Sequence, residues 1–351
     1  MINNTIINED IQLIISEDIN WDYLAGKTIL VTGASGFIPS YIVYTLLELN
    51  LLKFQNNPII VFALVRNKEK AEKKFNQFIL RNDLKIIVSD VVEPIQLKEN
   101  IDIIIHAASQ ASPKYYGKDP VGTLKANTLG TANMLDLAKN CGTKKFLYIS
   151  SGEVYGILDG TFDSIDETYT GNVDITNIRS CYAESKRMGE NMCVCWSHQY
   201  GFHVNMLRLS HTYGPGVELD DGRVFADFVK NIIYNEDIII NSDGKAKRSF
   251  VYINDMITAL FSVLINGENA HAYNITADKQ TEIKELAQTL CDMYPEKALN
   301  IKFCKANIIS GYIRSASSFA SLSSRKIKKL GWKQNISIEE GFRRMIDSYK
   351  Q

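Results

Sequence analysis

The residues with the clearest potential for chemistry are a tyrosine and a lysine, Tyr182 and Lys186, which are four positions apart in a segment with helical spacing. Residues four apart share one face of a helix, so the two side chains can meet above a bound cofactor. An ordinary phenol has a pKa of about 10. A neighbouring ammonium together with an oxidised nicotinamide favours the phenolate. The pair is therefore predicted to act as a base, in which Tyr182 takes the proton of a substrate hydroxyl near neutral pH.

A tyrosine and a lysine at this spacing also occur by chance, so the interpretation depends on the segments upstream of the pair. Residues 27–32 form an apolar run that ends in a glycine turn, and residues 41–51 have helical spacing. Strand, glycine turn and helix is the order that a dinucleotide site requires, because the amides that open the helix face a pyrophosphate. The residues predicted to bind it are Gly33, Ser35, Gly36, Phe37 and Ile38.

One residue of this turn departs from the dinucleotide pattern. Pro39 stands where a third glycine is expected. Its ring should loosen the packing of helix on strand, although its fixed φ suits a first helical turn.

The ends of the following strands indicate the rest of the cofactor site. Residues 58–65 are predicted to be the second strand, and Arg66 follows where an acid would normally bind the adenine ribose. Arg66 could accept a 2′-phosphate or stack on adenine, so NAD is expected and NADP stays open. Strands at 84–89 and 101–105 have small or polar residues beyond them, in the region where parallel sheets bind ligands. These residues are Asp90, Val91, Ala107 and Ala108.

The alternation of strands and helices predicts an α/β protein with a doubly wound parallel Rossmann sheet. A helix over 123–139 and strands over 145–150 and 203–209 complete the pattern. Residues 1–26 are predicted to be an N-terminal extension with a short amphipathic helix. Residues 27–209 should form the dinucleotide-binding domain. Residues 210–351 should form a smaller substrate-binding lobe, part of which returns to the first domain, with the active site in the cleft between them.

Charge and composition favour a small-molecule partner. Among the 351 residues, 39 Lys and Arg nearly cancel 40 Asp and Glu, which argues against nucleic acid or an anionic membrane as a partner. No apolar run approaches the roughly 20 residues of a membrane span. The six cysteines are scattered, and the histidines have no metal-ligand spacing. We therefore expect a cytoplasmic protein with reduced thiols and no metal.

Together, the glycine turn, Ser151, the Tyr182 and Lys186 pair and the turn at 213–215 resemble the extended short-chain dehydrogenase/reductase family of nucleotide-sugar epimerases, dehydratases and decarboxylases. The segments 111–113, 180–187, 221–224 and 248–250 look most like those of UDP-glucuronate decarboxylases. The resemblance runs from about residue 27 to the C-terminus. It implies a nucleotide-sugar substrate, a 4-keto intermediate and a homodimer formed through the helix that starts near Tyr182.

The resemblance also implies a role for each matching residue. Ser151 corresponds to the group that hydrogen-bonds the C4 hydroxyl, and Glu153 to a carboxylate near C5, with a pKa tuned by burial. Tyr182 corresponds to the base and Lys186 to a contact with the nicotinamide ribose. Guanidinium groups match phosphates and carboxylates, so arginines are expected among the substrate contacts. These predicted contacts are Ser112, Arg223, Arg248 and Arg314.

Three positions depart from the pattern and leave the reaction open. Gly152 stands where related decarboxylases have Ser and dehydratases have Asp, Gly216 where decarboxylases have Arg, and His211 where Asn is common. Decarboxylation of UDP-glucuronate is the favoured reaction, with 4,6-dehydration and then epimerisation as alternatives. A non-enzymatic NAD(P)-binding regulator is a further alternative, but such a protein has no need of an activated phenol.

Overall fold

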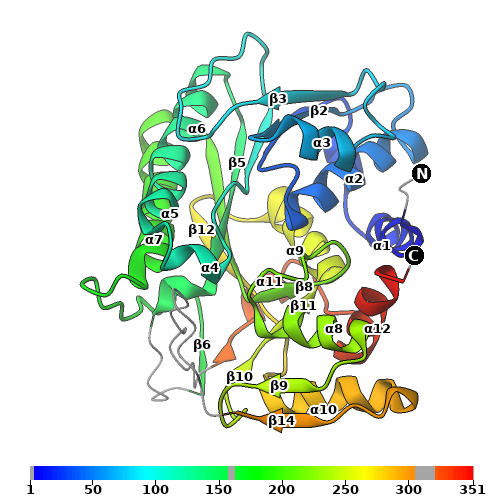
Figure 1. Ribbon diagram of the computed structural model, residues 1–351. Coiled ribbons are helices and arrows are strands. Elements are labelled where there is room, and N and C mark those ends of the chain that lie inside the picture. Colours follow the sequence, from blue (N-terminus) through cyan, green and yellow to red (C-terminus); the bar gives the residue numbers. More distant parts are fainter. Residues whose placement is uncertain (1–3, 157–162, 305–320, 351) are drawn as a thin grey trace.

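The structure is a computed structural model that describes residues 4–156, 163–304 and 321–350. Its centre is a seven-stranded sheet with the order β12-β7-β5-β4-β1-β2-β3, in which every neighbouring pair is parallel (Figure 1). The strands are β1 (Thr28–Thr32), β2 (Ile60–Val65), β3 (Leu84–Val88), β4 (Ile103–His106), β5 (Lys145–Ser151), β7 (His203–Leu209) and β12 (His271–Ile275). Because β1 lies inside the sheet and later strands extend it in both directions, the predicted doubly wound parallel sheet is confirmed.

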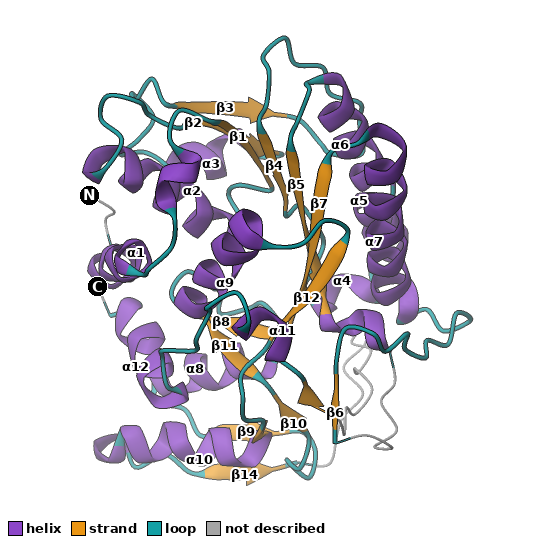
Figure 2. Cartoon of the chain, turned by 180° about the vertical axis from the view of Figure 1, so that it is seen from behind, coloured by secondary structure: helices purple, strands orange, loops and turns teal. Residues whose placement is uncertain are grey.

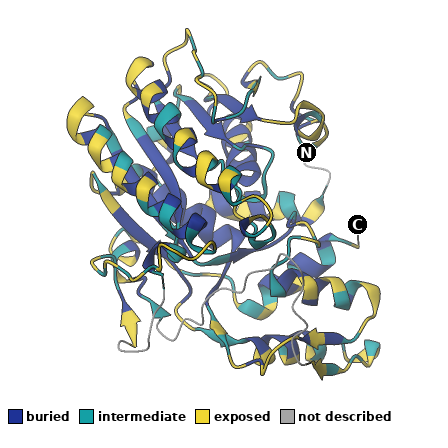
Figure 3. Cartoon of the chain, turned by 60° about the vertical axis from the view of Figure 1, so that its left-hand side comes forward, coloured by how far each residue is buried: buried dark blue, intermediate teal, exposed yellow. Residues whose placement is uncertain are grey.

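Helices cover both faces of this sheet (Figure 2). One face carries α2 (Phe37–Leu52), α3 (Lys68–Lys74) and α9 (Ile253–Asn266), and the other α5 (Pro120–Asn127), α6 (Leu129–Asn140) and α7 (Ser180–Tyr200). Successive strand residues point to opposite faces, so Ile29 and Val31 join the core under α2 while Leu30 joins the core under α6 and α7. The inner strands of the sheet are buried, whereas the edge strand β3 is partly exposed, and many exposed residues lie on the outer sides of the helices and in loops (Figure 3).

The helix expected over 123–139 is instead two helices. The first begins earlier, at Pro120, because the Asp119 carboxylate accepts a hydrogen bond from the Gly122 amide at 3.0 Å and caps the helix. At Thr128 the backbone departs from ideal helical angles, with φ −105° and ψ −68°, and the hydroxyl donates to the carbonyl of Leu124 at 2.7 Å. This side-chain bond to the preceding turn accompanies the break between α5 and α6.

Pro39 lies buried in the first turn of α2. The first helical hydrogen bond runs from the Ser40 amide to the Gly36 carbonyl at 3.1 Å, so the missing N–H of Pro39 interrupts no bond of the helix. The proline also lies close to the glycine turn, since a Cβ added to Gly36 would be 3.5 Å from the Pro39 ring. The expected loosening of the packing of helix on strand stays a prediction.

The C-terminal part of the chain builds a lobe from short strand pairs and helices. The pairs are β8 (His211–Tyr213) with β11 (Phe250–Tyr252), β9 (Ile238–Ile240) with β14 (Ile301–Phe303), β10 (Lys247–Arg248) with β13 (Thr281–Glu282), and β6 (Ser164–Ile165) with β15 (Ser321–Leu322). The helices are α8 (Val224–Tyr234), α10 (Ile283–Met293), α11 (Arg325–Lys328) and α12 (Ile338–Ser348). Between them, α9 and β12 return to the central sheet. The domain boundary placed at residue 210 stays a prediction.

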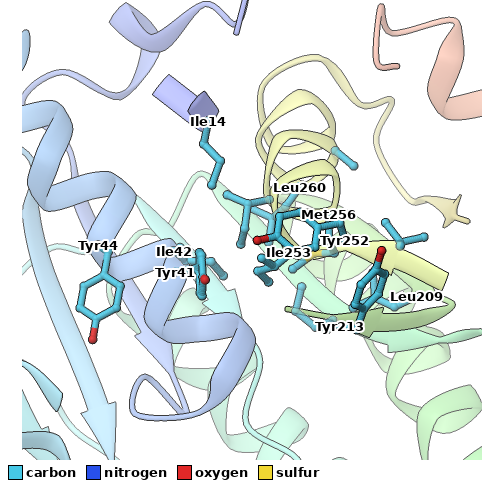
Figure 4. Packing of buried hydrophobic residues seen from close by; sticks show 14 of the residues in the cluster. Ile14, Tyr41, Ile42, Tyr44, Leu209, Tyr213, Tyr252, Ile253, Met256 and Leu260 are labelled. Carbon is cyan, nitrogen blue, oxygen red and sulfur yellow. The ribbon is translucent and has the colours of Figure 1, made fainter. Parts of the chain in front are cut away.

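The N-terminal helix α1 (Thr5–Ser16) joins the two parts of the molecule. It lies against α2, α9 and α12, so the two ends of the chain are neighbours in Figure 1. Ile14 points toward the apolar side chains of α9, among them Met256 and Leu260 (Figure 4). Beside them Asp10, which is fully buried, accepts hydrogen bonds from Tyr252 at 2.8 Å and from Arg344 at 2.9 Å.

Candidate active site

Tyr182 and Lys186 lie in the first two turns of α7, against the end of β5. Both side chains are buried. The Lys186 ammonium donates to the carbonyl of Ile149 at 2.7 Å and lies 5.9 Å from the centre of the Tyr182 ring. The helical spacing read from the sequence therefore does bring the amine and the phenol together.

Burial dominates the acidity of this pair. Burial raises the pKa of Tyr182 to about 12, although a hydrogen bond with Ser151 and the charge of Arg223 oppose the rise. Burial also lowers the pKa of Lys186 to about 7, against the opposing charge of Glu190. In the chain without cofactor, burial outweighs the nearby cations, so the phenolate expected from Lys186 together with an oxidised nicotinamide stays a prediction.

The tip of β5 carries the other predicted catalytic residues. Ser151 ends the strand, and its hydroxyl accepts a hydrogen bond from the Glu153 amide at 3.2 Å in the short helix η2 (Gly152–Tyr155). The Glu153 side chain is 37% exposed, so the burial expected for it is wrong. Between the two, Gly152 faces Leu322 of β15: a Cβ added to this glycine would be 2.9 Å from Leu322 Cδ1.

Two residues that the sequence reasoning did not select complete this cluster. Tyr116, in α4 (Pro113–Tyr116), stacks on Tyr182 with ring centres 4.8 Å apart and 20° between the planes. Arg179 lies over the Tyr116 ring at 4.7 Å, and its Nη2 donates to both carboxylate oxygens of Glu153, at 2.9 and 3.0 Å. The Arg179 side chain is only 11% exposed, and its buried Nε has no partner among the described residues.

A signal for Arg179 was present in the sequence. It precedes Tyr182 by three residues, and such neighbours share a helix face. Tyr116 carries no comparable signal, because it comes from a distant loop helix and reaches Tyr182 only through the fold.

The predicted cofactor loop has the geometry that a pyrophosphate requires. Gly33 has φ +66°, and a Cβ at that position would lie 3.0 Å from Ala108 Cα, so the loop admits no side chain there. Gly36 is the N-cap of α2 and offers no side-chain cap, which leaves the first helical amides available to an anion. The Thr32 hydroxyl accepts from the amides of Ala107 and Ala108 at 3.0 Å and ties this loop to the end of β4. These residues fit a dinucleotide.

The region expected to face the adenine ribose contains a loose ion pair. Arg66 Nη1 lies 3.7 Å from the carboxylate of Asp90, and both side chains are solvent-accessible. Val91 is buried under Gly130, where a Cβ would be 2.8 Å from Val91 Cγ2. The geometry of this region is compatible with the 2′-hydroxyl of NAD and with the 2′-phosphate of NADP.

The predicted substrate contacts are only partly brought together. The Ser112 hydroxyl donates to the carbonyl of Asp221 at 2.5 Å, and Arg223 forms a two-point ion pair with the Asp221 carboxylate. The Arg223 charge also lowers the pKa of Tyr182, so this guanidinium faces the site. Arg248 lies on β10, where its charge acts on His211. Arg314 lies outside the described residues.

His106 has a structural place at the end of β4. Its ring is buried between the hydroxyls of Thr32, at 2.8 Å, and Thr131, at 3.2 Å. Burial lowers its pKa to about 3, helped by the charge of Lys186.

Across the part of the chain that the structure describes, no group of three or more His, Cys, Asp or Glu side chains is placed to hold a metal ion. In the same residues, no helix has the length and apolar character to cross a membrane.

Comparisons with known proteins agree with this geometry. Residues 29–276 match the model of the NAD dependent epimerase/dehydratase family. The chain is 34% identical to UDP-glucuronic acid decarboxylase 1 of Arabidopsis thaliana, over 92% of this chain and 69% of the relative, and 32% identical to decarboxylase 3 of that plant, over 92% and 89%. The fold is similar to that of UDP-glucuronic acid 4-epimerase from Bacillus cereus, with a TM-score of 0.78, 23% identity and coverage of 92% and 99%.

Proposed function

This chain belongs to the NAD dependent epimerase/dehydratase family, and from that premise we propose that it decarboxylates UDP-glucuronate to a UDP-pentose through a 4-keto intermediate, with NAD as cofactor. The observation that carries the proposal is the cluster of Tyr182, Ser151, Glu153 and Arg179. It combines a base for a hydroxyl, a carboxylate that can handle a proton and a buried guanidinium suited to an anionic sugar.

The first step uses the phenol of Tyr182 as a base. When bound, NAD supplies a reversible hydride acceptor for C4 of the sugar. Tyr182 takes the proton of the C4 hydroxyl, while the Ser151 hydroxyl, which is hydrogen-bonded to Tyr182, orients that oxygen. The high pKa of Tyr182 in the chain alone means that cations in the loaded site must stabilise the phenolate.

The second step breaks the bond between C5 and C6. With a ketone at C4 the uronate is a β-keto acid, so its carboxylate leaves as carbon dioxide and the electron pair of the C5–C6 bond becomes the C4–C5 enolate. A proton from water, delivered with the help of Glu153, then adds to C5 in place of the lost carboxyl group. Arg179 holds the Glu153 carboxylate through Nη2, and the positive charge of its guanidinium would attract the uronate carboxylate. Tyr182 then gives its proton back to the C4 oxygen, which restores the sugar hydroxyl and the phenolate.

Mass spectrometry tests the reaction directly. The purified chain, catalytic NAD and UDP-glucuronate should give a UDP-pentose and carbon dioxide, with no build-up of reduced nicotinamide. The matched control is dTDP-glucose, a neutral hexose nucleotide. Unchanged UDP-glucuronate together with loss of water from the neutral hexose would replace the proposal by 4,6-dehydration. The environment of Gly152 disfavours that outcome, because a side chain at this position would have to displace Leu322 Cδ1, which lies 2.9 Å from the place of its Cβ.

We also propose that the protein is a cytoplasmic homodimer. Met188 and Val194 of α7 are 49% and 37% exposed, and Val121 of α5 is 58% exposed, so these adjoining helices present apolar surface to the outside. Burying that surface against a second copy would remove it from water. Light scattering should give twice the chain mass, and Met188→Lys should shift it toward the monomer. A wild-type monomer at micromolar concentration would contradict the dimer.

The six cysteines are all free thiols, which suits a reducing compartment.

A further inference from the structure

Lys74, the last residue of α3, carries an ammonium that no hydrogen bond or ion pair among the described residues engages. Its side chain is half-buried. The nearest acid is Glu218, and Lys70 already occupies it through an Nζ–Oε1 contact of 2.6 Å. Lys70 and Lys74 therefore face the same carboxylate, and the half-buried Lys74 ammonium keeps the capacity to bind an anion from outside the chain.

The backbone on both sides of this ammonium is anchored. The Tyr44 hydroxyl of α2 donates to the Lys74 carbonyl at 3.0 Å and ties the end of α3 to α2. The opposing loop contains Gly216, with φ +93°, and Val217, whose carbonyl accepts a hydrogen bond from the Tyr349 hydroxyl. Both the loop and the lysine are thus held in place.

The opening beside Gly216 brings Lys74 close to the start of α2. A Cβ added to Gly216 would lie 3.8 Å from Phe37 Cδ2 and 4.0 Å from Lys74 Nζ. Phe37 is the first residue of α2, directly after the glycine turn whose helix amides have no side-chain cap. Because residue 216 has no side chain, the amine of Lys74 is the cation that reaches this space.

We propose that the Lys74 ammonium binds a phosphate group at the mouth of the glycine turn, namely the pyrophosphate of the dinucleotide. This rests on NAD being the cofactor and is independent of which sugar reaction follows. A diphosphate carries negative charge on both phosphates, and an enclosed ammonium forms charge-assisted hydrogen bonds with such oxygens. Burial lowers the pKa of Lys74, and a bound phosphate would oppose that effect. Lys74 would thus add affinity that the backbone amides of α2 cannot supply alone.

The test compares ligands with and without phosphate on matched variants. The intrinsic tryptophan fluorescence of the purified chain is titrated with NAD, adenosine and UDP, for wild type, Lys74→Gln, Lys74→Arg and Lys73→Gln. Lys73 is the exposed neighbour in the same helix and serves as the control. Lys74→Gln should weaken NAD binding on the order of 10- to 100-fold, leave adenosine unchanged and be partly rescued by Lys74→Arg. Lys73→Gln should bind NAD like the wild type.

Three results would overturn the assignment. The first is equal NAD affinity of Lys74→Gln and wild type. The second is equal weakening by Lys73→Gln, which would reduce the effect to general charge. The third is weakened UDP binding with unchanged NAD binding, which would place the phosphate on the nucleotide sugar. Thermal unfolding of Lys74→Gln guards against a folding defect. Because the readout is binding, an inert UDP-glucuronate would refute the proposed reaction without affecting this result.

Discussion

Removing the ammonium of Lys186 should slow the reaction in a manner that depends on pH. In Lys186→Met the charge 5.9 Å from the centre of the Tyr182 ring is lost. With an effective dielectric constant of about 20, a unit charge at that distance contributes about 3 kcal/mol, or about two pKa units of the phenol. A raised pKa lowers the fraction of Tyr182 that is present as phenolate. At a pH at which Lys186 is charged in the wild type, kcat/KM of the variant should therefore be roughly 100-fold lower.

The sign of the pH dependence follows from the lowered pKa of Lys186, about 7. Below that pH the wild-type amine is charged and the advantage over Lys186→Met is complete. As pH rises through about 7, the wild type loses the charge, so the ratio of the two rates should shrink toward one near about pH 9. The assay is kcat/KM for UDP-glucuronate at saturating NAD from about pH 6 to 9.

The double variant Tyr182→Phe/Lys186→Met supplies the control. Without the phenol, the ammonium has no phenolate to stabilise, so the double variant should be as slow as Tyr182→Phe alone. A ratio of wild type to Lys186→Met that stays constant with pH would refute the reasoning. So would a further loss of rate in the double variant, since Lys186 would then act independently of Tyr182.

Three other substitutions test the remaining parts of the site. Tyr182→Phe should lower turnover on the order of 10²- to 10⁴-fold and keep NAD binding, and near wild-type turnover would remove Tyr182 as the base. Arg179→Met removes two charge-assisted contacts to Glu153 and should lower kcat/KM for UDP-glucuronate by about 10- to 100-fold, with binding of UDP as the unaffected control; an unchanged kcat/KM would exclude a role for the guanidinium. His106 has a pKa of about 3 in the fold and an ordinary value of 6.5, so the unfolded state takes up a proton first and stability is lost as pH falls below about 6.5. Urea denaturation should show that His106→Gln loses about 2 kcal/mol less than wild type between pH 7 and about 5, and equal losses would contradict the buried neutral ring.

The local patterns of the sequence were sufficient to predict the sheet and the proximity of Tyr182 and Lys186. Apolar runs bounded by glycine predict parallel strands because such strands are buried on both faces. The spacing of Tyr182 and Lys186 predicts their contact because helical geometry depends only on neighbours along the chain. The glycine turn at Gly33 and Gly36 is likewise a local feature, so its place between a strand and a helix could be recognised from the residues alone.

Local patterns failed where a contact joins distant segments. Tyr116 stacks on Tyr182, and Leu322 fills the space beside Gly152, although in each pair the partners are far apart in the sequence. The periodicity of a sequence does not predict contacts between residues so far apart. Ser112 and Arg223 both donate hydrogen bonds to Asp221, to its carbonyl and to its carboxylate respectively. The sequence analysis assigned no role to Asp221 itself.

The pKa values of Tyr182 and Lys186 are set by the tertiary structure. The sequence determined which groups could titrate and that the phenol and amine would share a helix face. Only the fold decided how much water each group loses, and that loss raises the pKa of Tyr182 and lowers that of Lys186 against the influence of their neighbours. Desolvation depends on every segment that covers the site, so its effect on the two pKa values could not be predicted from the sequence. The spacing of the two residues depends on one helix, so their shared face could be predicted.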